Sequence, residues 1–345
     1  MQSIYLLLTA ITVMSCVIWY FSFTRFTHER YQVLFCFPTE KKENSWSGFC
    51  ITWYGLIISL SFTFSFIIFV FLMGSSGISY LSVVIPVLIS VAIGVLASKL
   101  LAERIEKTKA TISVAAAMFT SFLLIPPSFF IYGKIFSETP IPVMIVLSSI
   151  SIAFAFGEGY GRIACISFGC CYGKPVDKTG WFLRRIFHRM NFTFRGGLKK
   201  ASYAGNLEGS PLVPIQGITS IVNVLTGITG IVLYYHGNFS STLLTVIISL
   251  SAWRILSEQF RIDNRGSGKI SAYQIMSLFN IGYSVFISVA LYSANPLLPD
   301  FEKGINAVLS REIFPVSIVI FSILLIFYGK SKVIFPEIKL KVGNN

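Results

Sequence analysis

One arginine lies at the end of an otherwise apolar stretch of the chain. Residues 140–161 carry a single charge, Glu158, and Arg162 follows them within a glycine-rich segment, residues 157–173. A charge at bilayer depth costs roughly 2.5 to 3.5 kcal/mol on insertion scales, so an ionisable residue there generally belongs to a functional site. Glycine lacks a Cβ and lets a ligand or a backbone approach closely. The sequence therefore indicates a functional site around Arg162.

A second charged group, Arg254, Glu258 and Arg261, ends another apolar run. Offsets of four and seven residues predict that all three lie on one face of a helix. The Glu258 carboxylate can hold one guanidinium in a fixed orientation and leave the others to bind a phosphate in bidentate fashion. Basic residues that flank a span also extend to the membrane interface without any such role, so that interpretation stays open for this pair of arginines.

Two further candidates have ordinary explanations. Glu158 precedes Arg162 by four residues, the favourable order for an ion pair within one helix, and such a pair serves structure as well as function. Tyr54 begins an apolar run, where aromatic residues are enriched simply because they anchor helices at the interface.

Three cysteines follow Arg162 closely, at positions 165, 170 and 171. Zinc takes four ligands at recognisable spacing, and no histidine lies between residues 29 and 187, so no metal site is predicted. A reactive thiol near arginine is the alternative to inert packing, which is the usual role of a buried cysteine. The six cysteines lie mostly in or beside apolar runs, and their spacing predicts no disulfide framework.

The composition is that of an integral membrane protein. Of 345 residues, 54% are hydrophobic and 12% are charged, whereas an average soluble domain has about 25% charged residues. Apolar runs of about 20 residues, the length that crosses a bilayer, occupy residues 3–24, 49–73, 77–98, 111–133, 140–161, 213–235, 239–257, 271–293 and 314–329. No segment alternates with period two, so helices must satisfy the backbone in lipid. We expect an all-α integral membrane protein, a polytopic bundle of about nine transmembrane helices.

Basic residues are unevenly distributed among the connections. Of 28 Lys and Arg, 24 lie in residues 25–48, 99–110, 174–212 and 254–270 and after residue 329. The positive-inside rule predicts that these segments are cytoplasmic and that the N-terminus lies outside. Alternatively, the cations collect anionic headgroups, which requires no particular side. Alternation of nine spans puts the span ends that carry Arg162 and Arg254 on the same side, so the arginines are expected to converge at one headgroup depth.

The connection at residues 174–212 is long enough to form one small extramembrane head. Within it, residues 181–189 interleave aromatic and basic side chains, a pattern that suits an interfacial helix. A solvated basic loop is the alternative. Nucleic acid is not expected as a partner, because a basic amphipathic segment in an integral membrane protein more commonly meets phospholipid.

These segments, in this order, resemble the bacterial prolipoprotein diacylglyceryl transferase family of membrane enzymes. The resemblance rests on residues 53–56, residues 161–163 with Gly173, Pro214 with Gln216, and Arg254, Glu258 and Arg261 followed by Asp263, Ser271 and Gln274. It implies a seven-helix core at residues 49–293, which includes the head, with residues 1–48 and 294–345 as additional segments.

The resemblance also implies an activity in the bacterial cytoplasmic (inner) membrane. Family members move the diacylglyceryl group of phosphatidylglycerol to the lipobox cysteine of a preprolipoprotein, forming a thioether and releasing glycerol phosphate, with no cofactor. By position, the catalytic residues are Tyr54, Arg162, Arg254 and Glu258, and the substrate-binding residues are Glu158, Gly161, Gly173, Gln216 and Arg261. Guanidinium groups aimed at the phosphate oxygen would stabilise the charge that develops as it leaves.

The chain departs from the family pattern in several ways. A histidine followed by two glycines is usual in the fourth span of this chain, and residues 107–114 contain neither, which removes a candidate base. Cys165, Phe168 and Cys170 replace the usual asparagines and glutamate, and the residues after Gln216 also differ. The family's site faces away from the cytoplasm, against the charge bias found here. A phospholipid-binding or transport protein without catalysis, or the same chemistry on a different acceptor, are the alternatives.

Overall fold

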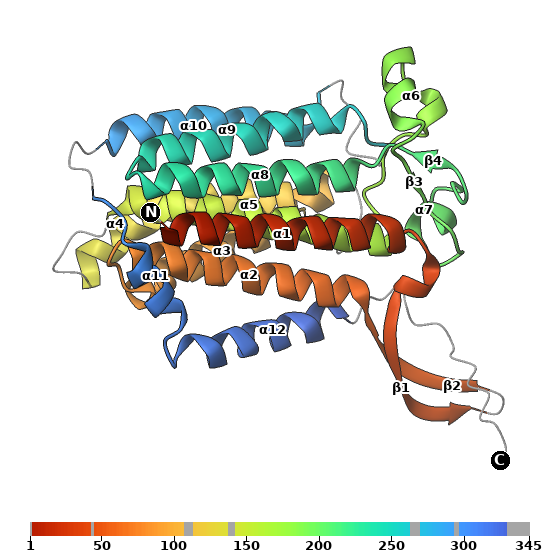
Figure 1. The fold of residues 1–345 in the computed structure, drawn as a ribbon, viewed down its shortest axis with the longest axis horizontal. Coiled ribbons are helices and arrows are strands. Elements are labelled where there is room, and N and C mark those ends of the chain that lie inside the picture. The colour runs from red at the N-terminus through yellow and green to blue at the C-terminus, as the bar shows by residue number, and fades with distance from the viewer. Residues whose placement is uncertain are drawn as a thin grey trace. The chain divides into compact units, whose positions relative to one another are not determined.

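The computed structural model describes residues 2–42, 45–106, 113–136, 142–262, 270–292 and 297–329. These are mainly helical, with two small two-stranded sheets (Figure 1). Eight helices are long and apolar enough to cross a membrane: α1 (Gln2–Arg25), α2 (Trp53–Ser75), α3 (Tyr80–Glu106), α4 (Val114–Phe136), α5 (Val143–Phe168), α8 (Ile215–Tyr235), α9 (Phe239–Glu258) and α10 (Ala272–Ala290). The bent pair α11 (Phe301–Val308) and α12 (Ile313–Gly329) supplies a ninth span if it is counted as one. The predicted polytopic all-α membrane bundle is confirmed.

Helix α5 is longer than the apolar run predicts. It continues to Phe168, so Arg162 lies inside the helix and not at its end. The helix ends at Gly169, whose φ of 72° lies in the left-handed region that glycine adopts without strain. The amide of Gly169 donates to the carbonyl of Ile166 and that of Cys170 to the carbonyl of Cys165, the two hydrogen bonds of a Schellman motif.

The chain divides into two compact units. Unit 1 comprises Met1–Ala10, Ser65–Phe156 and Ile221–Phe314, and unit 2 comprises Ile11–Phe64, Gly157–Ser220 and Pro315–Asn345. Several of the long helices, α5 among them, contribute residues to both units.

In unit 1, helices pack through small residues and buried hydroxyl groups. Helix α3 packs on α4, and α10 packs on α9 and α4. The hydroxyl of Tyr234 donates to the carbonyl of Leu72 at 2.9 Å, accepts from Ser149 at 3.0 Å and lies 2.7 Å from the hydroxyl of Ser76. This network satisfies polar groups that would be costly to leave unpaired in an apolar interior.

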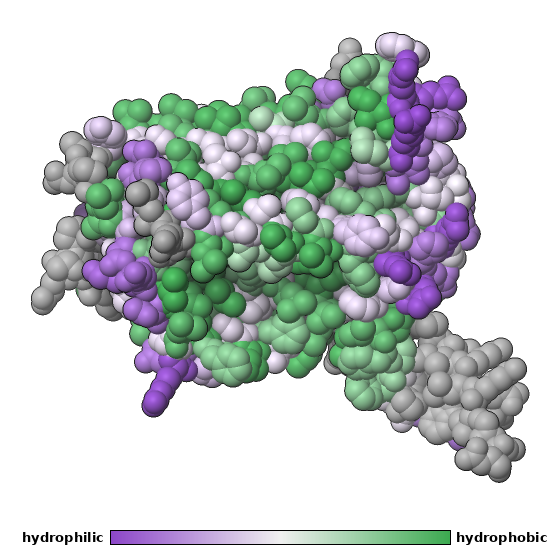
Figure 2. Space-filling view, in the orientation of Figure 1, coloured by the Kyte–Doolittle hydropathy of each residue, from purple (hydrophilic) through white to green (hydrophobic). Residues whose placement is uncertain are grey.

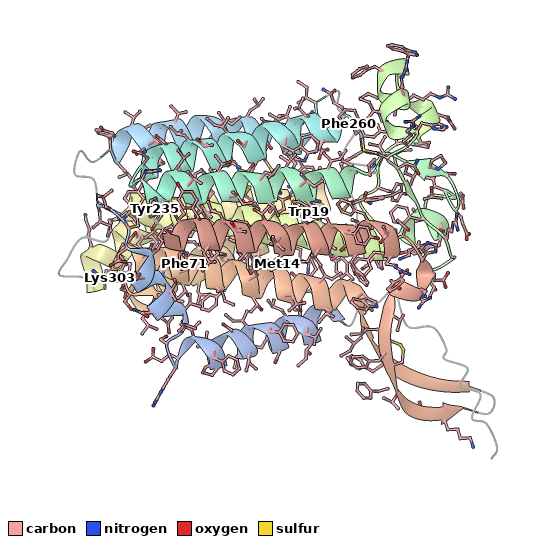
Figure 3. The ribbon with its side chains drawn as sticks, viewed as in Figure 1. Met14, Trp19, Phe71, Tyr235, Phe260 and Lys303 are labelled. Atoms are coloured by element: carbon pink, nitrogen blue, oxygen red, sulfur yellow. A yellow bond between two sulfur atoms is a disulfide. The ribbon has the colours of Figure 1, made fainter. Side chains whose placement is uncertain are left out.

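In unit 2, helices α1 and α12, at the two ends of the chain, pack on the helices between them. The Ser15 hydroxyl of α1 lies 2.7 Å from the hydroxyl of Tyr160 in α5, and Trp19 (Figure 3) donates to the hydroxyl of Ser220 in α8 at 2.9 Å. Helices α2 and α12 meet at Gly55, where an added Cβ would lie 2.5 Å from the Cα of Gly329. Each terminal helix is therefore part of the packed unit.

A disulfide-linked hairpin connects α1 to α2. Strands β1 (Val33–Lys42) and β2 (Ser45–Thr52) are antiparallel, with Cys36 opposite Cys50 in register and bonded to it (Figure 3). The cysteine spacing predicts no disulfide framework, so this bond was not expected. A disulfide requires neighbouring Cα positions, and the strand register that provides them is not visible in the cysteine spacing.

The predicted extramembrane head is a folded segment that packs on the end of α1. It contains η2 (Val176–Lys178), α6 (Trp181–Phe187), β3 (Phe192–Thr193), α7 (Lys200–Tyr203) and β4 (Pro211–Leu212). The amide of Glu29 donates to the carbonyl of Arg195 at 3.0 Å, and the amide of Arg195 donates to the carbonyl of Thr27 at 3.1 Å. Hydrophilic residues gather over this head, beside the hydrophobic surface of the helices (Figure 2).

Candidate active site

The predicted ion pair within α5 is present and buried. A guanidinium N–H of Arg162 donates to a carboxylate oxygen of Glu158, and the two side chains are 9% and 5% exposed. A buried charge without a partner is strongly destabilising. The ion pair with Glu158 therefore makes it possible for Arg162 to be buried within the protein.

Tyr54 lies beside the C-terminal end of α5. It stands in the first turn of α2, and its ring centroid is 5.6 Å from that of Phe168. Its phenol is close enough to the thiols of Cys165, Cys170 and Cys171 to interact with them electrostatically. The structure thus brings Tyr54 to the segment that follows Arg162.

Those three thiols form one cluster. The sulfur atoms of Cys165, Cys170 and Cys171 all lie within 4.8 Å of one another. In a Schellman motif, the third residue from the helix end commonly contacts the second residue beyond it, and these positions are Cys165 and Cys170. The prediction of separate packing residues overlooked this signal, which was visible as two cysteines placed around a helix-ending glycine.

Gln216 holds the turn that carries the thiols. It lies in the first turn of α8, is 2% exposed, and donates from Nε2 to the carbonyl of Cys170 at 2.9 Å. Its Oε1 has no hydrogen-bond partner among the residues that the structure describes. A buried acceptor without a donor is costly, so Gln216 offers an unused acceptor next to the cluster.

The two predicted site glycines, Gly161 and Gly173, differ in whether the structure leaves room for a side chain. A Cβ on Gly173 would lie 2.5 Å from the carbonyl oxygen of Val213 and 2.9 Å from its Cβ, so packing of the backbone excludes any side chain there. A Cβ on Gly161 would meet only the Cδ1 of Ile58, at 3.7 Å, an ordinary contact. Gly173 is therefore needed for the fold, whereas protein packing alone does not explain a glycine at 161.

Lys199 is a buried charged residue that the sequence interpretation missed. Its Nζ donates to the carbonyls of Phe26 at 2.8 Å and Ser167 at 2.5 Å, which joins the head to the ends of α1 and α5. Burial lowers the pKa of Lys199 to about 7, although Glu29 acts in the opposite direction. Nothing in the sequence distinguishes it from the seven other basic residues of the head.

Arg254, Glu258 and Arg261 belong to unit 1. Arg254 and Glu258 lie in the last turns of α9, one turn apart, but the helix ends at Glu258 and the buried Arg261 follows the turn after it. The prediction that all three share one helix face was therefore wrong for Arg261. The position of α10 against α9 is fixed by Gln274, which caps α10 with Ser271 and donates to the carbonyl of Ile255 at 3.1 Å. Asp263 lies outside the described residues.

A surface cavity of about 520 Å³ lies at the end of α1 in unit 2. None of the predicted site residues lines it, and its walls are basic and aromatic: Tyr20, Phe21, Thr24, Arg25, His28, Arg30 and Tyr31. This cavity is therefore not part of the site that the sequence predicts around Arg162.

Two comparisons with known proteins bear on these residues. The family model described as prolipoprotein diacylglyceryl transferase matches residues 44–290, a range that contains every predicted site residue. The chain is also similar to the phosphatidylglycerol–prolipoprotein diacylglyceryl transferase 2 of Clostridium perfringens (strain 13 / Type A), with 29% identity over 155 residues. That match covers 44% of this chain and 52% of the relative, so the chain spans about half the length of the curated relative that it matches.

The lowered pKa of Lys199 predicts a pH-dependent stability. Its pKa is about 7 in the folded protein and returns toward the ordinary 10.5 on unfolding, so between these values the unfolded chain binds more protons and stability rises with pH. Replacing Lys199 with methionine removes this rise, by up to about 1.4 kcal/mol per pH unit. Melting curves in detergent at a series of pH values measure it. The exposed neighbour Lys200→Met is the control and keeps the wild-type pH profile; an unchanged profile in Lys199→Met would contradict the assignment.

Proposed function

Because the chain belongs to the prolipoprotein diacylglyceryl transferase family, we propose that it transfers the diacylglyceryl group of phosphatidylglycerol to a cysteine thiol of a preprolipoprotein. The observation that carries the proposal is the buried Arg162–Glu158 pair inside an apolar helix. An intramembrane charge is expensive and marks a functional site. The C. perfringens relative, whose name describes this reaction, supports the choice of substrates.

The chemistry is a displacement at carbon. The acceptor sulfur, as thiolate, attacks the glycerol carbon that carries the phosphate; the carbon–sulfur bond forms, the carbon–oxygen bond breaks, and the electron pair stays on the phosphate oxygen of the departing glycerol phosphate. Negative charge therefore develops on that oxygen. Arg162, fixed by Glu158, is the group we assign to stabilise it, because a preorganised guanidinium in a low-dielectric site acts most strongly where charge develops.

We assign Arg254, Glu258 and Arg261 to the same phosphate. The proposal rests on the sequence: with alternating spans, the C-terminal ends of α5 and α9 lie on the same side of the membrane. Glu258 orients one guanidinium, and the other completes a clamp of positive charge.

Gln216, Tyr54 and Gly161 supply the neutral part of the proposed site. The unused Oε1 of Gln216 is an acceptor suited to a hydroxyl of the glycerol headgroup, which would satisfy a buried polar atom. Tyr54, beside the thiol cluster, is placed to hydrogen-bond the lipid or the acceptor. The space next to Gly161 admits a methyl group without a protein clash, which is consistent with a lipid approaching the backbone there.

We propose that this site faces the compartment outside the cytoplasm of a bacterial cytoplasmic membrane. Disulfides persist in oxidising compartments and are rare in the cytosol, and Cys36 and Cys50 form one in the hairpin that precedes α2. The head pairs with the chain just before that hairpin, at His28 and Arg195. This reverses the orientation that the charge bias predicts, and it assigns the basic residues of the head to anionic headgroups.

The side chains of helix α6 in the head suit contact with a surface of anionic headgroups. Trp181 and Phe182 are 77% and 64% exposed, and Arg184 and Arg185 follow within the same short helix. Exposed aromatic rings beside basic residues are typical of helices that lie in the membrane interface. A helix is present at Trp181–Phe187, within the residues 181–189 for which the sequence predicts an interfacial helix.

The activity prediction concerns Arg162. Wild-type protein in phosphatidylglycerol liposomes with a lipobox peptide should release glycerol phosphate and form the thioether peptide, and Arg162→Ala should lower the rate about 100- to 1,000-fold. The exposed Arg311→Ala, in the turn between α11 and α12, is the matched control and keeps the activity. Normal turnover by Arg162→Ala would remove Arg162 from the site. Saturable lipid binding by wild type without release would favour the binding protein.

The orientation prediction uses the exposed Lys178 of the head. In intact cells a membrane-impermeant maleimide should label Lys178→Cys above the wild-type background, because the head lies outside. Labelling of that variant only after the cells are opened would place the head in the cytoplasm and reverse the proposed orientation. The measurement compares labelled protein in intact and in opened cells from one culture.

A further inference from the structure

We propose that Cys165, Cys170 and Cys171 bind a divalent thiophilic cation of the zinc type, whose fourth coordination position takes the acceptor thiol. This inference rests on the proposed function, since it names how the acceptor is activated. Catalytic zinc sites combine three protein ligands with one open position, and thiolates are among its preferred ligands.

The spacing of the sulfur atoms fits one metal ion. All three lie within 4.8 Å of one another, and sulfurs that each lie about 2.3 Å from a tetrahedral zinc are about 3.8 Å apart. Side-chain rotations of modest size therefore close the cluster around an ion. The thiol of Cys165 already contacts those of Cys170 and Cys171.

The backbone is arranged to bring the thiols together. The Schellman turn at Gly169 folds Cys170 back over Cys165, and Gln216 fixes the carbonyl of Cys170. Cys171 has a φ of 54°, in the left-handed region that non-glycine residues seldom adopt. A strained backbone persists where the surroundings enforce it, commonly at ligand sites. Three independent constraints thus converge on the same three sulfurs.

Charge and exposure fit an ion with an open position. Three thiolates and a dication leave a net charge of about −1, and the guanidinium of Arg162 is close enough to Cys165 to interact with it electrostatically. Cys165 is buried, whereas Cys170 and Cys171 are partly exposed. The cluster therefore has one enclosed side and one side that an incoming thiol can reach.

Such an ion would allow the acceptor thiol to be deprotonated although the histidine that is usual in the family is missing here. A thiol that binds zinc loses its proton, here to solvent, so no protein base is required. The bound sulfur then attacks the glycerol carbon; the carbon–sulfur bond forms, the carbon–oxygen bond breaks, and glycerol phosphate departs with the electron pair. The neutral thioether leaves the metal, whose oxidation state is unchanged, and water or the next thiol replaces it.

Zinc binding tests the inference without an activity assay. Full-length protein in detergent is stripped with chelator under reducing conditions, incubated with Zn²⁺ and freed of excess by gel filtration, and metal is then counted by mass spectrometry. We expect about one zinc per chain in wild type and in the control Cys16→Ser, and less than about a tenth of that in Cys170→Ser and in Cys171→Ser. Cys16 is a free, exposed cysteine of α1 and so matches the chemistry of the change.

A second measurement distinguishes the loss of a zinc ligand from unfolding of the variant. Cobalt in a thiolate site gives an intense sulfur-to-metal charge-transfer absorption, which wild type and Cys16→Ser should show. The elution position on gel filtration identifies any variant that has unfolded, and the two partly exposed positions are tested separately for this reason. Undiminished zinc in both cysteine variants, no zinc in wild type, or a disulfide between two of the three cysteines in the isolated protein would overturn the inference.

Failure of the inference and failure of the proposed function give different results. Release of glycerol phosphate at the full rate by zinc-free protein in chelator would overturn the metal site and leave the transferase intact. Zinc bound by the cluster in a protein that releases no glycerol phosphate from phosphatidylglycerol would support the site and contradict the transferase.

Discussion

The ion pair between Arg162 and Glu158 is the interaction on which the rest of the site depends. A guanidinium inside a membrane helix is tolerable only with a compensating charge nearby, and a carboxylate one turn earlier in the same helix provides it. Helix α5 can therefore continue for two further turns to Gly169. The charge is held within the protein, where a low dielectric would strengthen its action on the phosphate of the proposed substrate.

The C-terminal end of α5 is the point to which the head and the start of α8 are hydrogen-bonded. Lys199 bonds the carbonyl of Ser167, one of those that a helix leaves without an internal partner at its C-terminus, and so anchors the head there. Gln216 bonds the next turn from the start of α8. Together they fix the thiol-bearing turn between two helices. The arrangement also explains why a glycine is needed at 173, where the returning chain touches Val213.

Much of this was predictable from the sequence, and the failures have physical causes. The spans, the Arg162–Glu158 pair and the helix that begins at Trp181 follow from local periodicity and composition, which act over a few residues. The Cys36–Cys50 bond, the buried Lys199 and the thiol cluster depend on register and on a turn, which bring together groups that spacing does not relate. Arg261 left the predicted helix face because the helix ends three residues before it.

Exchanging the two charges of the pair separates a structural role from a chemical one. In the variant Glu158→Arg with Arg162→Glu, the ion pair is kept but the guanidinium moves one turn along α5, away from the thiol cluster. We expect a folded protein, with the wild-type elution position, that no longer releases glycerol phosphate from phosphatidylglycerol liposomes. Release at the wild-type rate by the exchanged protein would show that the pair only stabilises the helix, and it would contradict the proposed chemical role of Arg162.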